Sequence, residues 1–345
     1  MILSKLTVAD EEAYVDFLQK AYRDQFNSYR FESRAEVKKF WRWEYLDNPQ
    51  HIHEKPLIWV CRSGDNIVGQ LCVMPVKVKL CNGIYQGGWC QDFMVLPDFR
   101  GKGIGQKLVH EVKNGLHDTM DVVMAVIATE NSRAIFRKEG FTEVGEVNKN
   151  VAVTAASNIL LSIRRFGARR SIEVQEANIS GGEFNHLWEC LSKKFDCLIM
   201  RDAETLNWRF APQRYWTYRA FIAKAYGVPK GYVIVKEKVC RIKRRQSSNT
   251  GIIADIFFDP AEQNIGRTLI ETALHCIKGT LPVVRCDAMN PSVQKLLKSA
   301  GFITIKSANR FLLYLSERVA KEDIVSARKK CNWYITYGDS DLDLS

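Results

Sequence analysis

The stretch from Val95 to Gly105, VLPDFRGKGIG, decides the fold class of this chain. An apolar segment, Phe93 to Leu96, runs into it. Apolar residues at helical spacing follow it: Ile104, Leu108, Val109, Val112 and Leu116. The sequence therefore predicts a strand, a glycine-rich turn and an amphipathic helix. Glycines let a ligand approach the backbone, and the free N–H groups at a helix start attract anions. This pattern is typical of a pyrophosphate cradle.

Two common phosphate-binding loops do not fit this stretch. A Walker loop requires Lys after its last glycine, whereas Gln106 follows Gly105. A dinucleotide fingerprint requires G-x-G-x-x-G, which differs from the spacing Gly101-x-Gly103-x-Gly105. The pattern that fits is R/Q-x-x-G-x-G/A, which is supplied by Arg100, Gly103 and Gly105. It resembles motif A of the GCN5-related N-acyltransferases, the GNAT proteins.

This resemblance implies a co-substrate and a set of residues that hold it. GNAT proteins bind the pyrophosphate of acyl-coenzyme A at this loop, and their sheet splays beside it to admit the pantetheine arm. Asn131-x-x-Ala134 and the closing Gly140-Phe141 resemble motif B of the family. Acyl-CoA is thus the expected co-substrate, with no metal. Its expected contacts are Met94, Val95, Arg100, Gly101, Lys102, Gly103, Ile104, Gly105, Asn131 and Phe136.

Landmarks of the first half of the chain return in the same order in the second half. Trp43-Glu44-Tyr45 corresponds to Trp208-Arg209-Phe210, Val95-Leu96-Pro97 to Phe258-Asp259-Pro260, and Gly140-Phe141 to Gly301-Phe302. Such a repeat indicates two copies of one α/β unit. We therefore expect two tandem GNAT-like domains, each a twisted mixed β-sheet flanked by helices. Residues 1–155 would form the first domain, 156–171 a linker, and 172–345 a degenerate second domain.

The two copies differ at the loop. The second copy has Ala261 to Thr268 at this place, with the single glycine Gly266 and with Glu262 where an anion would sit. A carboxylate repels a phosphate. We therefore expect acyl-CoA to bind to the first copy.

Acyl transfer from a thioester to an amine requires a proton acceptor and a donor for the oxyanion. Asp92, in a largely apolar strand, is the first candidate for the acceptor, although a purely structural hydrogen bond would also explain it. The family resemblance places the oxyanion donor at a backbone N–H near Met94 or Val95. Many GNAT enzymes carry a tyrosine four residues before the motif B glycine. Here Phe136 holds that position, so the proton donor for the thiolate stays open.

Three residues are candidates for binding the acyl acceptor. Arg209, flanked by Trp208, could clamp a phosphate or stack on a base, and helix-end packing is the alternative. His51, in a polar loop, could act near neutral pH or lie at the surface. The tail from Trp333 to Asp343 is aromatic and then acidic. Its three alternating aspartates suggest a cation site, but no second ligand cluster is evident, so we expect a solvated end.

Composition bounds the class of protein. The chain of 345 residues is 46% hydrophobic and 26% charged, as in soluble globular proteins. Its apolar runs are too short to span a bilayer, and its ten cysteines show no zinc spacing. We expect a cytoplasmic protein that binds neither membrane nor nucleic acid. The net charge of +11 is compatible with two polyphosphate ligands.

Segments outside the loop resemble a narrower group. Trp43 to Pro49, Leu206 to Phe210 and the Thr336 to Asp341 tail are similar to bacterial GNAT proteins encoded with genes for surface polysaccharides such as O-antigen and lipopolysaccharide. This resemblance implies an N-acyltransferase that acylates the amine of a nucleotide-linked deoxyamino sugar by direct attack in a ternary complex. A homodimer is a separate expectation. Transfer to protein or peptide amines and tRNA-dependent aminoacyl transfer stay open. A non-catalytic interaction protein would not need an intact loop.

Overall fold

The computed structural model describes residues 1–26, 33–50, 56–153, 172–210, 217–239, 249–277 and 283–340. The chain divides into two compact units. Unit 1 comprises Met1–Val78, Ile84–Gly145 and Ala308–Ile324, and unit 2 comprises Lys79–Gly83, Glu146–Ser307 and Val325–Ser345. Among the helices described, none combines the length and the apolar composition needed to cross a membrane.

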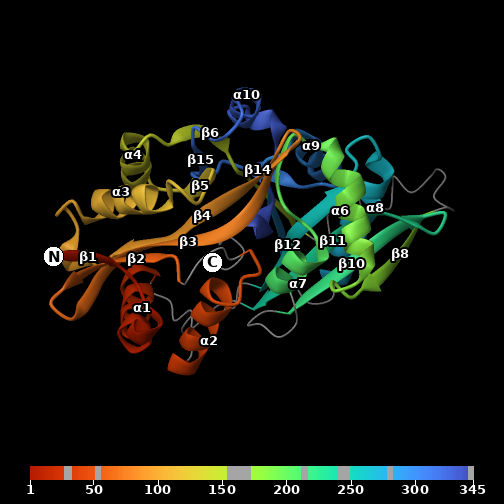
Figure 1. Ribbon diagram of the computed structural model, residues 1–345. Helices are drawn as coiled ribbons and strands as arrows, with labels where there is room; N and C mark the ends of the chain where they lie inside the picture. The colour runs from red at the N-terminus through yellow and green to blue at the C-terminus, as the bar shows by residue number, and fades with distance from the viewer. Residues whose placement is uncertain are drawn as a thin grey trace. The chain divides into compact units, whose positions relative to one another are not determined.

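Unit 1 is built on a mixed sheet with the strand order β1-β2-β3-β4-β5-β15-β6. Figure 1 shows α3 and α4 on one side of the long strands β3 and β4, and α1 and α2 on the other. The elements in chain order are β1 (Ile2–Lys5), α1 (Glu11–Phe26), α2 (Arg34–Tyr45), β2 (Ile58–Ser63), β3 (Asn66–Leu80), β4 (Gly83–Val95), α3 (Ile104–Leu116), β5 (Val122–Ile127), α4 (Glu130–Lys138), β6 (Thr142–Glu146) and β15 (Arg310–Leu315).

The predicted strand, turn and helix around the glycine loop are confirmed. β4 ends at Val95, and α3 begins at Ile104. The buried residues of α3 are the five expected from helical spacing, Ile104, Leu108, Val109, Val112 and Leu116. The loop is therefore held between a strand and a helix that both belong to the core.

Unit 2 repeats this architecture with the strand order β8-β10-β11-β12-β13-β7-β14. Its elements are β7 (Asn148–Val153), β8 (Ile172–Ala177), α6 (Gly182–Leu191), β9 (Cys197–Ile199), α7 (Ala203–Phe210), β10 (Tyr218–Ala225), β11 (Val228–Val239), β12 (Asn249–Phe258), α8 (Gln263–Ile277), β13 (Val283–Ala288), α9 (Pro291–Ser299), β14 (Ile303–Ile305) and β16 (Trp333–Tyr334). The helix α10 (Lys321–Ala327) precedes β16. The predicted class, mixed α/β with two flanked sheets, is confirmed.

The two copies of the repeat exchange their last main strand. β15, from the second copy, pairs with β5 of unit 1 from Arg310↔Ile127 to Leu315↔Val122. β7, from the first copy, lies between β13 and β14 of unit 2. The compact units are thus discontinuous in sequence, whereas the predicted domains 1–155 and 172–345 are continuous. The predicted linker at 156–171 lies outside the described residues.

Candidate active site

The strand before the glycine loop parts from its neighbour. β4 and β5 pair in parallel from Gly87↔Val122 to Cys90↔Ala125. β4 continues to Val95 and β5 to Ile127, so the register ends before the last residues of both strands. Backbone groups beyond the last pair can hydrogen-bond to an extended ligand instead of to a strand. The register therefore ends before Met94, the place where the splay is predicted.

The loop after β4 forms an open cradle. Gly101 and Gly103 both have φ of 75°, a left-handed conformation that L side chains rarely adopt. A Cβ on either glycine would meet no atom within 4 Å. No side chain caps α3 at Gly103, and a backbone hydrogen bond runs from Lys107 N to Gly103 O at 3.2 Å. The N–H groups of the first turn of α3 precede that bond, and uncapped N–H groups at a helix start suit an anion.

Two basic side chains brace the cradle. Arg100 Nε donates to the carbonyl oxygen of Val95 at 3.0 Å, and Lys102 Nζ donates to that of Asp98 at 3.0 Å. Both side chains are exposed at the loop. They therefore hold the loop backbone and add positive charge beside the helix start.

The predicted motif B residues have different places. Asn131 is exposed in the first turn of α4. Phe136 is fully buried, with its ring 5.6 Å from that of Phe93 and 5.0 Å from that of Phe141. A Cβ on Gly105 would lie 2.9 Å from the same Phe93 ring. The structure thus gives Phe136 a packing role beneath the cradle, and its contact with the co-substrate stays a prediction.

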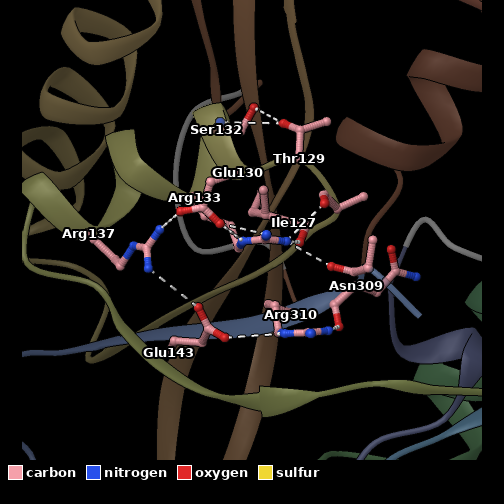
Figure 2. A network of polar contacts seen from close by, with 11 residues as sticks. Ile127, Thr129, Glu130, Ser132, Arg133, Arg137, Glu143, Asn309 and Arg310 are labelled. Atoms are coloured by element: carbon pink, nitrogen blue, oxygen red, sulfur yellow. Dashed lines mark hydrogen bonds and ion pairs between the residues drawn. The ribbon is translucent and has the colours of Figure 1, made fainter. Parts of the chain in front are cut away.

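Arg133 fixes the end of β5, as Figure 2 shows. Its Nη1 donates to the carbonyl oxygens of Ile127, Ala128 and Ala308 at 3.4, 2.9 and 2.8 Å. Its Nε and Nη2 donate to Glu130 Oε2 at 3.0 and 2.6 Å. The carbonyls of Ile127 and Ala128 are local, but only the fold brings Ala308 to Arg133, so the sequence gives no signal for this link.

Asp92 lies in β4 with φ of 50°. Its Oδ1 accepts a hydrogen bond from the Tyr22 hydroxyl at 2.6 Å, and its Oδ2 accepts one from the Tyr45 hydroxyl at 3.2 Å. The preceding residue, Gln91, donates from Nε2 to Glu44 Oε1 at 2.8 Å. Adjacent strand residues normally point to opposite faces. Here Gln91 and Asp92 both reach the helices α1 and α2, because the left-handed residue interrupts the alternation.

The side chains of Asp92 and Phe93 therefore lie on different faces of β4. Asp92 contacts α1 and α2, whereas the next residue, Phe93, packs against α4 and faces Gly105 of α3. The cradle and the carboxylate belong to opposite faces of β4.

Tyr45 and Cys72 are neutral neighbours of this carboxylate. Both side chains are almost completely buried. Burial raises the pKa of the Tyr45 hydroxyl and of the Cys72 thiol well above their usual values, and the charge of Asp92 adds to both shifts. Tyr45 therefore stays a hydrogen-bond donor, and Cys72 is not a thiolate nucleophile.

The second copy lacks the cradle. Glu262 precedes α8, and its Oε1 lies 3.3 Å from Lys230 Nζ. A Cβ on Gly266 would lie 2.6 Å from Phe258 and from Leu296. A carboxylate and tight packing thus take the place of open, positively polarised backbone.

In unit 2 the pairing of the corresponding parallel strands, β12 and β13, also ends early, but there the C-terminal segment packs against the strand ends. β12 and β13 pair in parallel as far as Ile252↔Arg285, although β12 continues to Phe258. The C-terminal segment, residues 333–340, is buried throughout. Its Thr336 forms an isolated bridge with Ala288 at the end of β13. The expectation of a solvated tail is therefore wrong for these residues, because they pack between two strand ends.

Arg201 joins the C-terminal segment to β12. The Arg201 side chain is 2% exposed; its Nε lies 3.2 Å from Asp255 Oδ2, and its Nη2 lies 2.5 Å from Asp339 Oδ2. Asp255 also accepts hydrogen bonds from Tyr232 at 2.7 Å and from Thr336 at 2.9 Å. Asp255 stands five residues before Pro260, as Asp92 stands five before Pro97. The second copy's aspartate is thus engaged inside the protein.

Two of the three residues predicted to bind the acceptor are buried in unit 2. Arg209 is 5% exposed and donates from Nε to the carbonyl oxygen of Gly338 at 3.1 Å, with a second bond to Ser340. Trp208 beside it is 9% exposed. Both belong to the packing around the C-terminal segment, the alternative that the sequence left open beside a phosphate clamp. His51 lies outside the described residues.

Asp339 is expected to make stability depend on pH. Burial raises its pKa from 3.8 to about 6, against the lowering effect of Arg201 and with a further rise from Asp255. The folded protein then holds this proton more tightly than the unfolded chain. The Asp339 contribution to the free energy of unfolding therefore falls as the pH rises from about 4 to about 6. Wild type should lose stability relative to Asp339→Asn across this window in urea denaturation; parallel curves would contradict it.

Residues 54–143 match the family model described as the acetyltransferase (GNAT) domain. This part of the chain is therefore similar to a GNAT domain. The matched range includes β4, the cradle, β5 and α4, which are the elements that build the site. A search of curated proteins returned no match. Across the described part of the chain, no group of three or more His, Cys, Asp or Glu side chains is placed to hold a metal ion.

Solved structures with a similar fold cover both units. A GCN5-related N-acetyltransferase from Anabaena variabilis is 13% identical with a TM-score of 0.65, covering 91% of this chain and 72% of that one. A probable N-acyltransferase from Enterococcus faecalis is 13% identical with a TM-score of 0.63 and the same coverage. Saccharomyces cerevisiae N-myristoyltransferase with bound myristoyl-CoA is 11% identical with a TM-score of 0.63, covering 91% and 82%. These likenesses show the GNAT fold, and the domain match supports an enzyme of the acyltransferase class.

Proposed function

We propose that this protein is an acyl-CoA-dependent N-acyltransferase and that unit 1 carries the reaction. The observation that carries the proposal is the cradle at Gly101 and Gly103 beside the parted strands β4 and β5. The uncapped start of α3 suits the pyrophosphate of the co-substrate, and the parting suits an extended arm. The match to a GNAT domain over the same residues supports this assignment.

The residues of β4 would carry the chemistry by direct attack. The amine nitrogen forms a bond to the thioester carbonyl carbon, the C–S bond breaks, and CoA leaves as the thiolate. Asp92 takes the proton that the amine loses. A backbone N–H at Met94 or Val95 stabilises the oxyanion while the carbonyl carbon is tetrahedral. The buried, protonated Cys72 offers no covalent route, which favours a ternary complex.

The acceptor we propose is the amine of a nucleotide-linked deoxyamino sugar. Its support is the resemblance of three sequence segments to amino-sugar acyltransferases, together with the net charge of +11. The buried Trp208 and Arg209 are not part of that support. Release of CoA should be followed with acetyl-CoA and a longer acyl-CoA against a nucleotide-linked amino sugar, a peptide with a free N-terminus and an aminoacyl-tRNA. Transfer to the peptide or use of the tRNA in place of the sugar would overturn the acceptor assignment.

Asp92→Asn is expected to lower kcat about 100-fold, because the amide cannot accept the amine proton. The affinity for acyl-CoA should not change, since the cradle lies on the other face of β4. Single-turnover rates and isothermal titration with acetyl-CoA measure the two effects separately. Asp118→Asn is the control, because it removes the same charge from a side chain that is 92% exposed. An unchanged rate in Asp92→Asn would exclude Asp92 as the proton acceptor.

A further inference from the structure

The two oxygens of Asp92 are held by two phenols from two different helices. Tyr22 of α1 donates to Oδ1 at 2.6 Å, and Tyr45, the last residue of α2, donates to Oδ2 at 3.2 Å. Tyr22 is 4% exposed and Tyr45 is 1% exposed, whereas Asp92 is half-buried. The donors are therefore fixed within the core, while the carboxylate they hold retains access to the surface.

The direction of the Tyr45 hydrogen bond is set by its neighbours. Gln91 Nε2 lies 2.8 Å from Glu44 Oε1 and 3.1 Å from the Tyr45 hydroxyl oxygen. The Glu44 carboxylate accepts hydrogen bonds, so it selects the NH₂ group of Gln91 on that side. The Tyr45 oxygen then accepts from Gln91, and its own proton points to Asp92. The buried Glu44 thus orients a chain of donors that ends on Asp92.

Unit 2 shows what the same position does without this arrangement. Asp255 lies at the equivalent place before its proline and also accepts from a tyrosine, Tyr232, at 2.7 Å. However, Asp255 is 3% exposed, and Arg201 and Thr336 also occupy its oxygens. Because Asp255 is bonded to Arg201, Tyr232 and Thr336 inside the protein, its carboxylate has a structural role. Asp92 differs in its partial exposure and in accepting from two tyrosines, one on each oxygen.

We propose that Tyr22 and Tyr45 are positioning residues that clamp Asp92 as the ionised proton acceptor of the acyl transfer. This inference rests on the proposed function. Hydrogen bonds from neutral donors favour the charged form of a carboxylate without cancelling its charge. They also fix its rotamer, which sets the direction of the carboxylate. The two tyrosines act through Asp92 and transfer no atom themselves.

The first test needs no substrate. The carboxyl carbon of Asp92, labelled with carbon-13, is titrated by NMR and assigned by the loss of its signal in Asp92→Asn. Tyr22→Phe should move the midpoint of this titration upward by about one pH unit, because the charged form loses a donor. Tyr232→Phe removes a tyrosine–aspartate bond from unit 2 and should leave the Asp92 signal unchanged. An unchanged midpoint in Tyr22→Phe would overturn the clamp.

The second test uses turnover. Tyr22→Phe should lower kcat about tenfold, leave KM for acetyl-CoA unchanged and move the acidic limb of the rate profile to higher pH. In an Asp92→Asn background the same substitution should have no further effect, because the tyrosine acts through the carboxylate. Additive losses would show a merely structural role. Failure of wild type to bind acetyl-CoA would overturn the proposed function instead, and the NMR titration would still decide the clamp.

Discussion

Gly103→Trp is expected to weaken acetyl-CoA binding by about 1,000-fold or more, a loss of about 4 kcal/mol. Gly103 directly precedes α3 with φ of 75°, and the space around its missing Cβ is open to 4 Å. An indole there would cover the N–H groups that the pyrophosphate needs. Isothermal titration with acetyl-CoA, a longer acyl-CoA and free CoA measures the effect, and all three should lose affinity together.

A matched control separates this effect from backbone strain. Gly227 has φ of 77° and equally open surroundings, but it lies in the turn between β10 and β11 of unit 2. A side chain at a left-handed position costs roughly 1–2 kcal/mol at either site. Gly227→Trp should therefore lose similar stability and keep full affinity. Retained binding in Gly103→Trp would mean that the cradle does not hold the co-substrate.

Arg201→Ala is expected to lower the free energy of unfolding by about 3–5 kcal/mol. The substitution would leave Asp255 and Asp339 buried in the same place without the guanidinium between them. Two carboxylates in a dry interior repel each other and cannot both stay ionised. Urea denaturation followed by tryptophan fluorescence measures the loss, and Trp333 in the C-terminal segment reports on the region directly.

The control for Arg201→Ala is another arginine of unit 2. Arg219 lies 2.8 Å from Glu176, but the two side chains are 42% and 52% exposed. Exposed ion pairs contribute about 1 kcal/mol or less, so Arg219→Ala should have a small effect. Equal losses in the two variants would show that the buried pairing of the C-terminal segment is not a major source of stability.

Local features of the site were readable in the sequence because they depend on neighbouring residues. The positive φ of Gly101 and Gly103 and the buried face of α3 follow from residue type and helical spacing. The weak loop of the second copy, with Glu262, was equally evident. The repeat predicted two similar sheets, and both have the same strand order.

Contacts between distant segments were not readable. Tyr22 and Asp92 are 70 residues apart, and Arg201 and Asp339 are 138 apart, so no local pattern marks either pair. Arg209 carries the charge and the aromatic neighbours of a phosphate clamp, yet its partners are carbonyls of the C-terminal segment. A residue's type states what it can bind, whereas the fold determines which partner reaches it first.

The sequence by itself determined the glycine cradle, the helix behind it and the presence of two α/β copies, because dihedral preference and hydrophobic periodicity act within a few residues. Only the tertiary structure decided that β7 and β15 change sheets, that the C-terminal segment fills the parting in unit 2, and that Asp92 is held by Tyr22 and Tyr45. Two strands with similar patterns can complete either sheet. The choice between them is made by the packing of the whole chain, to which every segment contributes.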